Sequence, residues 1–516
     1  MRLDLMGSGA LNRAVGGDDA DTRSGSRHAA APPSERAVSA LTIALHPDPR
    51  RLGERTLVLA REDGAPIRLA RRETTFAHPH GDAPARALDD PYVSREPVEL
   101  KAEGGHITIR ARAAARLRVD GELAPAELRV GAMQNVVLTL ADRVVLLLHP
   151  HVVGEVGPTY GITGRSRAIA ATRRAIRRVA DLDAPVLLRG PSGVGKERVA
   201  LAIHAASGRA GELVSINVAA LPPSLASSEL FGHARGAFTG AGAAHRGLFE
   251  RADGGTLFLD EVGELAPEVQ PMLLRALEQG TVRRLGEETE RPIDVRVIAA
   301  TDADLERDVD EGRMRAALYH RLRGFEIAVP PLAERIEDLP ALMLEMLEAE
   351  LTRTGELARL EGDDPDRPMW IDPRLVERLL AHGWPGNVRA LRALVRQLVV
   401  ANRTEPSLVA DRAVEGMLGP RASRASLADA KDVSDDALLE ALERAGWSFT
   451  KAASALGVSK SALYRRAEGH PGVRVAAEIG DEELESALAD HGGDLRATAA
   501  ALKVSLRALK LRCARR

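Results

Sequence analysis

Hydrophobic and polar positions alternate over short runs between residues 37 and 150. The runs are of strand length, show no helical period, and are interrupted by Asp120-Gly121, a hairpin signal between apolar segments. Many short strands without helices are typical of a β-sandwich, and we therefore expect one over residues 37–150. The apolar runs expected to form strands cover residues 41–45, 56–59, 106–109, 136–140 and 144–148.

The pattern changes after residue 160, where strand-like and helix-like segments alternate. This alternation predicts a parallel α/β sheet over residues 161–335. After Pro330-Pro331 only helical periods follow, which predicts a helical lid over residues 336–404. We expect strands at 185–188, 213–218, 256–259 and 295–300, and helices at 197–206 and 269–278.

The remaining segments are polar or repetitive. Residues 1–36 are rich in Gly, Ser, Ala, Asp and Arg and are expected to be a disordered tail, while 151–160 and 405–432 are expected to be linkers. The C-terminal part repeats itself at an offset of 46 residues, as 433–470 and 471–516. Alanine-rich helices can match by chance, but the shared Gly446/Gly492 and Val-Ser spacing favours a duplication.

Composition limits the class of protein. The chain has 516 residues, 45% of them hydrophobic, which is enough for about three or four globular domains. Its single cysteine, Cys513, excludes an internal disulfide or a thiolate cluster and indicates a reducing compartment. There is no signal-peptide pattern, and no apolar run approaches the ~20 residues that span a bilayer. We therefore expect a cytoplasmic protein without a membrane partner.

A glycine-rich loop follows the first strand of the α/β region. Its glycines let backbone N–H groups approach phosphate oxygens, the following helix adds its positive end, and Lys196 supplies a charge. Glu197 stands where a Mg²⁺-binding hydroxyl is usual. A structural turn is the alternative interpretation. The expected nucleotide-binding residues are Gly190, Pro191, Ser192, Gly193, Val194, Gly195, Lys196 and Glu197.

Two acids, Asp260 and Glu261, follow the expected strand Thr256-Leu257-Phe258-Leu259, whose pattern is typical of a buried strand. Ligands bind at the carboxyl ends of parallel strands, and two carboxylates there are costly unless they hold a metal or act on water. We assign Asp260 to Mg²⁺ and Glu261 to polarising the attacking water. Two solvated acids at a strand end are the alternative.

The segment Gly236-Ala237-Phe238-Thr239-Gly240-Ala241 places a Phe-Thr pair between glycines that can act as hinges. With the phosphate-binding loop, it resembles the AAA+ activators of sigma-54 RNA polymerase, whose contact loop reads GAFTGA. The resemblance covers about residues 160–405. It implies a ring, a hexamer, that hydrolyses ATP with Mg²⁺ and remodels the closed promoter complex of the sigma-54 holoenzyme through these six residues.

The same resemblance assigns further residues. Asn217 matches the residue that restrains the catalytic Glu until nucleotide is sensed; Arg315 and Arg321 match the pair that reaches into the neighbouring subunit's site. Arg389, in Trp384-Pro385-Gly386-Asn387-Val388-Arg389, matches the lid arginine that reads the nucleotide. Asp302 occupies the sensor position where the family prefers Asn. The family's charged residues are also replaced by Ala317, Ala333 and Ala390.

The first C-terminal copy carries three helical patterns with Gly457 at a tight turn, and it resembles the Fis-type helix-turn-helix of the same activators. It implies upstream promoter DNA as a partner. The second copy, with Ser505–Arg512 as its recognition segment, is either a second reader or a degenerate packing or dimerisation hairpin. The expected DNA-binding residues are Ser459, Lys460, Ser461, Tyr464, Arg465 and Arg466.

Within residues 37–150, the segments 67–71 (IRLAR), 88–95 (LDDPYVSR) and Asp120-Gly121 resemble parts of a forkhead-associated (FHA) domain, a reader of phosphothreonine proteins. The resemblance places Arg71, Ser94 and Arg95 at the phosphate. Ala70, Pro97 and Asp120 depart from the family's residues. A sandwich kept for other protein contacts is the alternative.

Together these features predict a sigma-54-dependent, ATP-driven activator tethered to DNA and regulated by its N-terminal domain. Asp302 and the alanine substitutions support an alternative, a DNA-bound AAA+ regulator of weak ATPase activity acting as a repressor or scaffold. An AAA+ remodeller of other proteins is a third possibility. The intact loop at 236–241 disfavours both alternatives.

Overall fold

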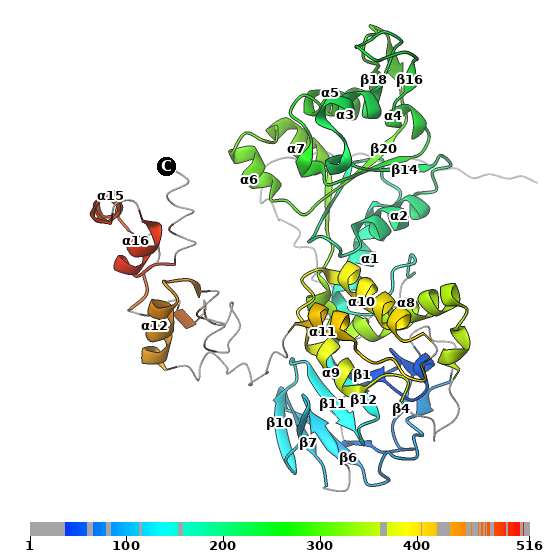
Figure 1. Cartoon of the computed structure of the whole chain (residues 1–516), viewed down its shortest axis with the longest axis vertical. Coiled ribbons are helices and arrows are strands. Elements are labelled where there is room, and N and C mark those ends of the chain that lie inside the picture. Colours follow the sequence, from blue (N-terminus) through cyan, green and yellow to red (C-terminus); the bar gives the residue numbers. More distant parts are fainter. Residues whose placement is uncertain are drawn as a thin grey trace, which may run out of the picture.

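The chain folds into an N-terminal pair of sheets, a helical lid, an α/β unit and a separate C-terminal helical region (Figure 1). The expected disordered tail, 1–36, lies outside the residues that the structure describes. The computed structural model describes residues 37–58, 65–78, 84–112, 116–152, 158–361, 369–403, 405–419 and 434–449, with shorter stretches between 452 and 509.

The N-terminal region contains two main sheets, a six-stranded one in the order β2-β1-β12-β11-β8-β9 and a four-stranded one in the order β10-β7-β6-β3, and a short two-stranded sheet of β4 and β5. Apolar side chains of both sheets, among them Ile43, Leu100 and Leu146, form one core. Asp120 and Gly121, with φ of 50° and 88°, form the turn of the predicted hairpin. The strands are β1 (Ala37–Leu45), β2 (Arg55–Val58), β3 (Ile67–Leu69), β4 (Thr75–Phe76), β5 (Arg86–Ala87), β6 (Val98–Glu103), β7 (His106–Arg110), β8 (Leu117–Val119), β9 (Glu122–Leu123), β10 (Glu127–Gly131), β11 (Val136–Leu140) and β12 (Val144–Val152).

The α/β unit contains the predicted parallel sheet, in the order β14-β17-β20-β13-β21. The expected strands and helices are present, and the sheet separates two apolar clusters. Its strands are β13 (Val186–Arg189), β14 (Leu213–Asn217), β17 (Thr256–Asp260), β20 (Arg296–Thr301) and β21 (Phe325–Ala328). Its helices are α1 (Arg167–Val179), α2 (Lys196–Ser207), α3 (Pro223–Phe231), α4 (Leu248–Arg251), α5 (Gln270–Gln279), α6 (Leu305–Asp310) and α7 (Ala316–Leu322).

The lid is helical, as expected, but it extends further than predicted. Residues 405–419, taken from sequence as part of a linker, contain α11, whose Val414 and Leu418 are buried in the lid core. These two residues are four apart and therefore share one face of the helix, and Asp411 caps it by accepting from Val414 N. The lid comprises the 3₁₀ segment η5 (Leu332–Asp338), α8 (Leu339–Thr354), η6 (Leu357–Leu360), α9 (Pro373–Ala381), α10 (Asn387–Ala401) and α11 (Arg412–Leu418).

The N-terminal sheets and the lid share a hydrophobic core. Leu45, Leu52 and Leu147 of the six-stranded sheet and its first turn join the buried side chains of α8 to α11 in one cluster. The contact places the sheets directly beneath the lid (Figure 1). No sequence pattern predicted this contact.

The C-terminal region has helices α12 (Asp435–Arg444), α15 (Asp481–Asp490) and α16 (Leu495–Ala501). α12 and α15 begin at positions that the predicted repeat relates. Buried residues from both copies, including Leu442 and Leu484, form one cluster. Among the described residues of the whole chain, every helix is too short or too polar to cross a bilayer.

Candidate functional site

The glycine-rich loop connects β13 to α2. In the parallel sheet, β13 lies between β20 and β21, so the loop begins at the ends of these strands. Gly193 and Gly195 have φ of 77° and 105°, values that side chains rarely adopt. Lys196 is buried, and its Nζ donates to the Gly190 carbonyl at 2.9 Å. Backbone N–H groups, a helix N-terminus and a buried ammonium thus surround one small space, which fits a polyphosphate.

The two predicted acids lie beside this loop. Asp260 ends β17, and Asn217 lies opposite it at the end of the neighbouring strand β14. Glu261 has a left-handed backbone, with φ of 55°, which indicates a residue held in place by its surroundings. Its Oε1 lies 3.9 Å from Lys196 Nζ. The structure therefore brings Lys196, Asp260, Glu261 and Asn217 to one edge of the sheet.

The pKa of the Glu261 carboxyl is raised above its ordinary value, chiefly by burial. The nearby charge of Lys196 opposes this shift, while the Asp302 and Asp260 carboxylates add to it. Asp302 directly follows β20 and is exposed. It therefore adds negative charge beside the residue predicted to polarise water.

The helical lid also contacts the phosphate-binding loop. Arg389 of α10 donates from Nη1 to Ser192 Oγ at 2.9 Å and from its backbone N to the Gly193 carbonyl at 3.2 Å. A Cβ added to Gly193 would lie 2.6 Å from the carbonyl oxygen of Gly386, so the lid backbone requires glycine there. Arg389 therefore lies against the phosphate-binding loop, and its role in reading the nucleotide stays a prediction.

Two residues that no sequence pattern singled out for this site hold the loop against the lid. Asn387, buried and with φ of 52°, donates from Nδ2 to the Ser192 carbonyl at 2.9 Å and accepts from Leu332 N. Arg335, also buried, donates from Nη2 to the Val194 carbonyl at 3.0 Å. The tight Pro385-Gly386-Asn387 turn was the available signal for Asn387, since Asn adopts left-handed backbone more readily than most residues.

Within the described residues no group of three or more His, Cys, Asp or Glu side chains could hold a metal by itself. Mg²⁺ bound to a nucleotide takes most of its ligands from phosphates and water and only one or two from carboxylates. Asp260, at a strand end beside the loop, fits that smaller contribution.

The predicted arginine pair lies away from this chain's own loop. Arg315 and Arg321 are exposed on or beside α7, and Arg321 donates to the Leu277 carbonyl at 2.7 Å. α7 is nevertheless tied to the strand before the loop. Glu306 accepts two bonds from Arg189, at 2.7 and 2.8 Å, and one from Tyr319 of α7, and these partners lower its pKa to about 2.

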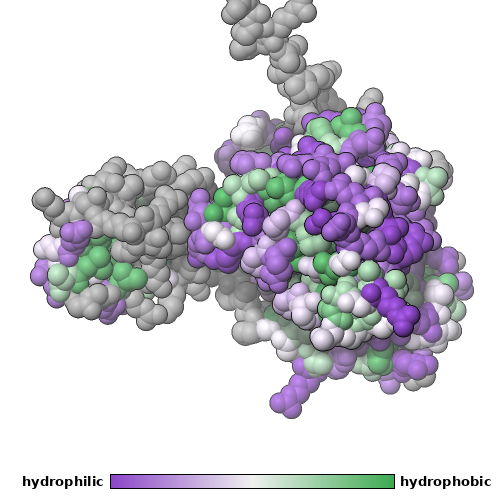
Figure 2. All heavy atoms as spheres, turned by 90° about the horizontal axis from the view of Figure 1, so that it is seen from above, coloured by the Kyte–Doolittle hydropathy of each residue, from purple (hydrophilic) through white to green (hydrophobic). Residues whose placement is uncertain are grey.

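The segment 236–241 forms the tip of a loop between β15 (Gly232–His233) and β16 (His245–Arg246). It lies at the end of the α/β unit opposite the lid, beside the hairpin β18 (Thr281–Arg283)–β19 (Glu290–Pro292). Viewed onto this end, the surface is mostly hydrophilic with smaller hydrophobic areas (Figure 2). Gly236 and Gly240 have φ of 80° and 106°, and Phe238 is 39% exposed.

Two predicted sites remain, the phosphate site of the N-terminal sheets and the DNA-binding segment, and the structure describes only part of the second. Arg71 N donates to the Ser94 carbonyl at 3.3 Å and Arg71 Nε to the Asp90 carbonyl at 2.9 Å, so Arg71 and Ser94 lie together while Arg95 is exposed. In the first C-terminal copy, Arg466 pairs with Asp435 of α12. Five predicted DNA-binding residues lie outside the described residues: Ser459, Lys460, Ser461, Tyr464 and Arg465.

Comparison with known families gives two matches. Residues 162–328 match the sigma-54 interaction domain, and residues 430–468 match the Fis family of bacterial regulatory proteins. The first match contains the phosphate-binding loop, both acids and the loop at 236–241.

Similar proteins include transcription regulators of several bacteria. The nitric oxide reductase transcription regulator NorR2 of Cupriavidus necator is 39% identical over 412 residues, which cover 74% of each chain. The transcriptional regulatory protein ZraR of Escherichia coli O157:H7 is 38% identical over 61% of this chain and 71% of its own. The Nif-specific regulatory protein of Azotobacter vinelandii is 39% identical, and the alignment spans 60% of this chain but only 59% of that relative.

Among solved structures, NtrX from Brucella abortus in complex with ADP is 33% identical. The match covers 60% of this chain and 69% of NtrX, with a TM-score of 0.45.

Proposed function

This chain belongs to the family of sigma-54-dependent transcription activators, and we propose that it uses ATP hydrolysis to remodel the closed promoter complex of sigma-54 RNA polymerase. The observation that carries the proposal is the position of the 236–241 loop. It projects from the same α/β unit that holds the phosphate-binding loop, with Phe238 partly exposed at its tip.

Each residue at the edge of the parallel sheet has its own role in ATP hydrolysis. Lys196 and the loop backbone hold the β- and γ-phosphates, Asp260 contributes to a bound Mg²⁺, and Glu261 orients the attacking water as a base. Mg²⁺, when bound, neutralises phosphate charge. Nucleotide must replace the Gly190 carbonyl as the partner of Lys196 Nζ. The position of Asn217 opposite Asp260 supports a role in restraining Glu261 before nucleotide is sensed.

Arg315 and Arg321 complete the site from a neighbouring protomer in a ring, a hexamer. Their exposure supports action in trans. Arg321 would exchange its bond to the Leu277 carbonyl of its own chain for a phosphate oxygen of the neighbour. Exposed guanidinium groups on one protomer stabilise the charge of a phosphoryl group bound to the next.

Two further regions direct the activity. The Fis-type unit, with Ser459 to Arg466 as its recognition segment, tethers the ring to upstream promoter DNA. The N-terminal sheets regulate the ring, and Arg71 and Ser94, which lie together, support a phosphothreonine protein as their ligand. Calorimetry with phosphothreonine peptides on wild type and Arg71→Ala tests this ligand, and no heat with the wild type excludes it.

The test of the main proposal is transcription reconstituted with sigma-54 holoenzyme. Wild type is expected to open promoters only with ATP, while Phe238→Ala keeps its ATPase rate within about twofold and loses open complexes. Leu225→Ala, which removes another exposed apolar side chain from the same unit, is the matched control and is expected to behave as wild type. Normal promoter opening by Phe238→Ala contradicts the assignment of the loop.

Asp302 favours a second candidate, a DNA-bound regulator of weak ATPase activity that represses or scaffolds. Burial raises the pKa of Glu261 and the Asp302 carboxylate adds to that rise, which favours the protonated form that cannot act as a base. ATP hydrolysis too slow to open promoters in the reconstituted assay, with DNA binding intact, would support this candidate.

A further inference from the structure

The N-terminal sheets are attached to the part of the ATPase unit that touches the phosphate-binding loop. α9 packs on β1, β11 and β12, and the apolar cluster beneath it includes Leu45 and Val145 from the sheets and Leu379 from α9. A cluster of this kind holds two elements in one arrangement, since interiors are closely packed and do not deform continuously.

A buried ion pair fixes this contact. The carboxylate of Glu377 on α9 is 7% exposed, and its Oε1 accepts from Arg118 Nη2 of β8 at 2.8 Å and from Thr139 Oγ1 of β11 at 2.6 Å. Removing one charge of a buried pair leaves the other without compensation, which destabilises the contact. Arg118 also pairs with Asp142 at the end of β11.

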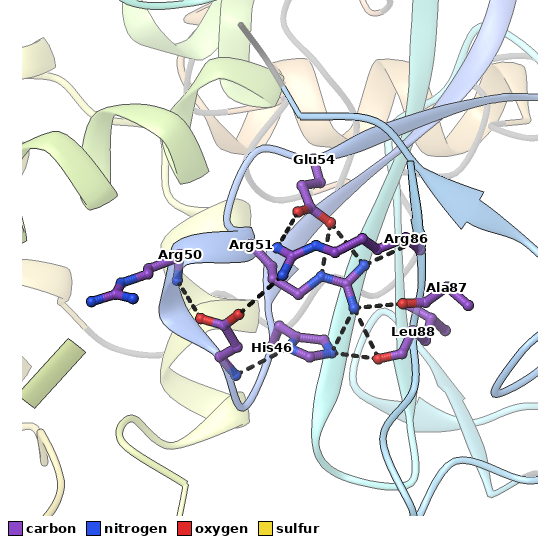
Figure 3. A network of polar contacts seen from close by, with 8 residues as sticks. His46, Arg50, Arg51, Glu54, Arg86, Ala87 and Leu88 are labelled. Atoms are coloured by element: carbon purple, nitrogen blue, oxygen red, sulfur yellow. Dashed lines mark hydrogen bonds and ion pairs between the residues drawn. The ribbon is translucent and has the colours of Figure 1, made fainter. Parts of the chain in front are cut away.

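A second polar contact lies at the first turn of the sheets. The Trp370 indole Nε1, just before α9, donates to the His46 carbonyl at 2.8 Å in a buried position. Figure 3 shows how this turn is held, with Arg51 between the Glu54 carboxylate and the carbonyls of Ala87 and Leu88. The acceptor of the Trp370 bond therefore belongs to a rigid turn.

The lid transmits this arrangement to the nucleotide site. α9 is joined to α10 by the turn 382–386, where the Trp384 indole donates to the Leu379 carbonyl at 2.9 Å. α10 begins with Asn387 and Arg389, which bond Ser192 and Gly193 of the phosphate-binding loop. α9 is thus fixed to the sheets, and α10, the next helix, to the phosphate-binding loop.

We propose that Glu377 is a positioning residue for the nucleotide site, because it locks the N-terminal sheets and the lid into one body whose placement sets the affinity for nucleotide. The proposal rests on the ATPase role given above. It explains how the N-terminal sheets act on the nucleotide site. Since coupling is reciprocal, nucleotide changes the affinity of the sheets for any ligand that prefers one lid position by the same factor.

The test is the affinity of the full chain for ADP, measured by calorimetry in wild type, Glu377→Gln and Trp370→Phe. Glu377→Gln removes the buried one of the two carboxylates that pair with Arg118. Trp370→Phe removes the bond to His46 and keeps an aromatic ring at that position. Both are expected to weaken ADP binding three- to tenfold, with kcat for ATP within about twofold of wild type and KM raised in parallel. The KM-against-kcat split separates lid positioning from loss of catalytic groups.

Arg378→Gln is the matched control. Arg378 is the next residue on α9, but it pairs with Glu415 of α11, at 2.6 Å, and so joins the lid only to itself. It is expected to lower the melting temperature and leave ADP affinity within twofold of wild type.

The outcomes distinguish the two proposals. If wild type binds ADP and hydrolyses ATP, but Glu377→Gln and Trp370→Phe match it in ADP affinity while melting earlier, the contact is only structural and the inference is wrong. If Glu377→Gln does not fold, Trp370→Phe decides alone. If wild type itself binds no nucleotide, the proposed ATPase function fails first.

Discussion

The ring of Phe238 meets the ring of His233 at an angle of 64°, with 4.9 Å between their centroids. His233 is itself fixed, since Ser228 Oγ lies 2.7 Å from its Nδ1 and the Ala243 carbonyl 3.0 Å from its Nε2. The proposed sigma-54 contact therefore rests on an anchored imidazole in this state.

We predict that His233→Ala frees the loop without changing hydrolysis. An edge-to-face aromatic pair contributes about 0.5–1.5 kcal/mol beyond burial, so its loss raises the population of open loop about two- to tenfold. Limited chymotrypsin digestion measures this as faster cleavage at Phe238, and Phe238→Ala identifies the cleavage site. Equal cleavage rates for His233→Ala and wild type would show that the ring contact does not restrain the loop.

We predict that Asp302→Asn moves the acid limb of the ATPase pH profile to lower pH. Burial raises the pKa of Glu261, and Asp302 adds to that shift, so removing its charge lets the base ionise at lower pH. Steady-state hydrolysis between pH 5 and 8 measures the limb. Asp310→Asn, which neutralises an exposed acid on α6, is the control, and identical limbs in the two variants would exclude Asp302 as the cause.

Acid should destabilise the N-terminal sheets through buried histidines. Burial, with the charge of Arg55, lowers the pKa of His149 from 6.5 to about 3, and burial, with Arg51, lowers that of His46 to about 4. The unfolded chain therefore binds more protons below pH 6.5, and stability present above that pH is lost as pH falls towards 4. At pH 5, His46 and His149 each lower the free energy of unfolding by about 2 kcal/mol relative to neutral pH.

His149→Gln tests this, because it cannot titrate. Thr42 Oγ1 lies 2.9 Å from His149 Nε2 and accepts from Arg55 Nε, so the charge of Arg55 stands close to the ring and opposes its protonation. Urea unfolding at pH 5, 6 and 7 should show a shallower pH dependence in His149→Gln than in His106→Gln, which changes an exposed histidine. Parallel slopes would place the titrating group elsewhere.

The second C-terminal copy should be required for folding of the first. Ile479, Leu484 and Leu502 of the second copy share a core with Leu438 and Leu442 of the first. Deleting residues 475–516 is therefore expected to unfold the first copy and abolish DNA binding. The measurements are circular dichroism and a footprint, and a folded, binding truncation contradicts the shared core.

A test of DNA binding by the second copy needs substitutions that leave the shared core intact. Arg507→Ala with Lys510→Ala keeps the apolar residues and, if both side chains meet phosphates, lowers the slope of log affinity against log salt by about 1 for each. An unchanged slope and footprint would leave the second copy as a packing partner.

The sequence by itself determined the local chemistry of this protein. The loop 190–197, the acids at 260–261 and the loop 236–241 are contiguous segments, and each needs particular residues at particular spacings for backbone reasons that hold in any context. The strands of the sheets and the parallel α/β unit followed from periodicity, because a half-buried strand alternates and a fully buried one does not.

The tertiary structure alone decided how the parts are joined. The Trp370 bond to His46 spans 324 residues, and Glu377 meets Arg118 and Thr139 across 259 and 238. The sequence around these residues does not indicate that they meet, since an apolar face has the same pattern whether it packs inside its own domain or against another. The same reason hid α11 within an apparent linker, because its buried residues Val414 and Leu418 become core only when the rest of the lid covers them.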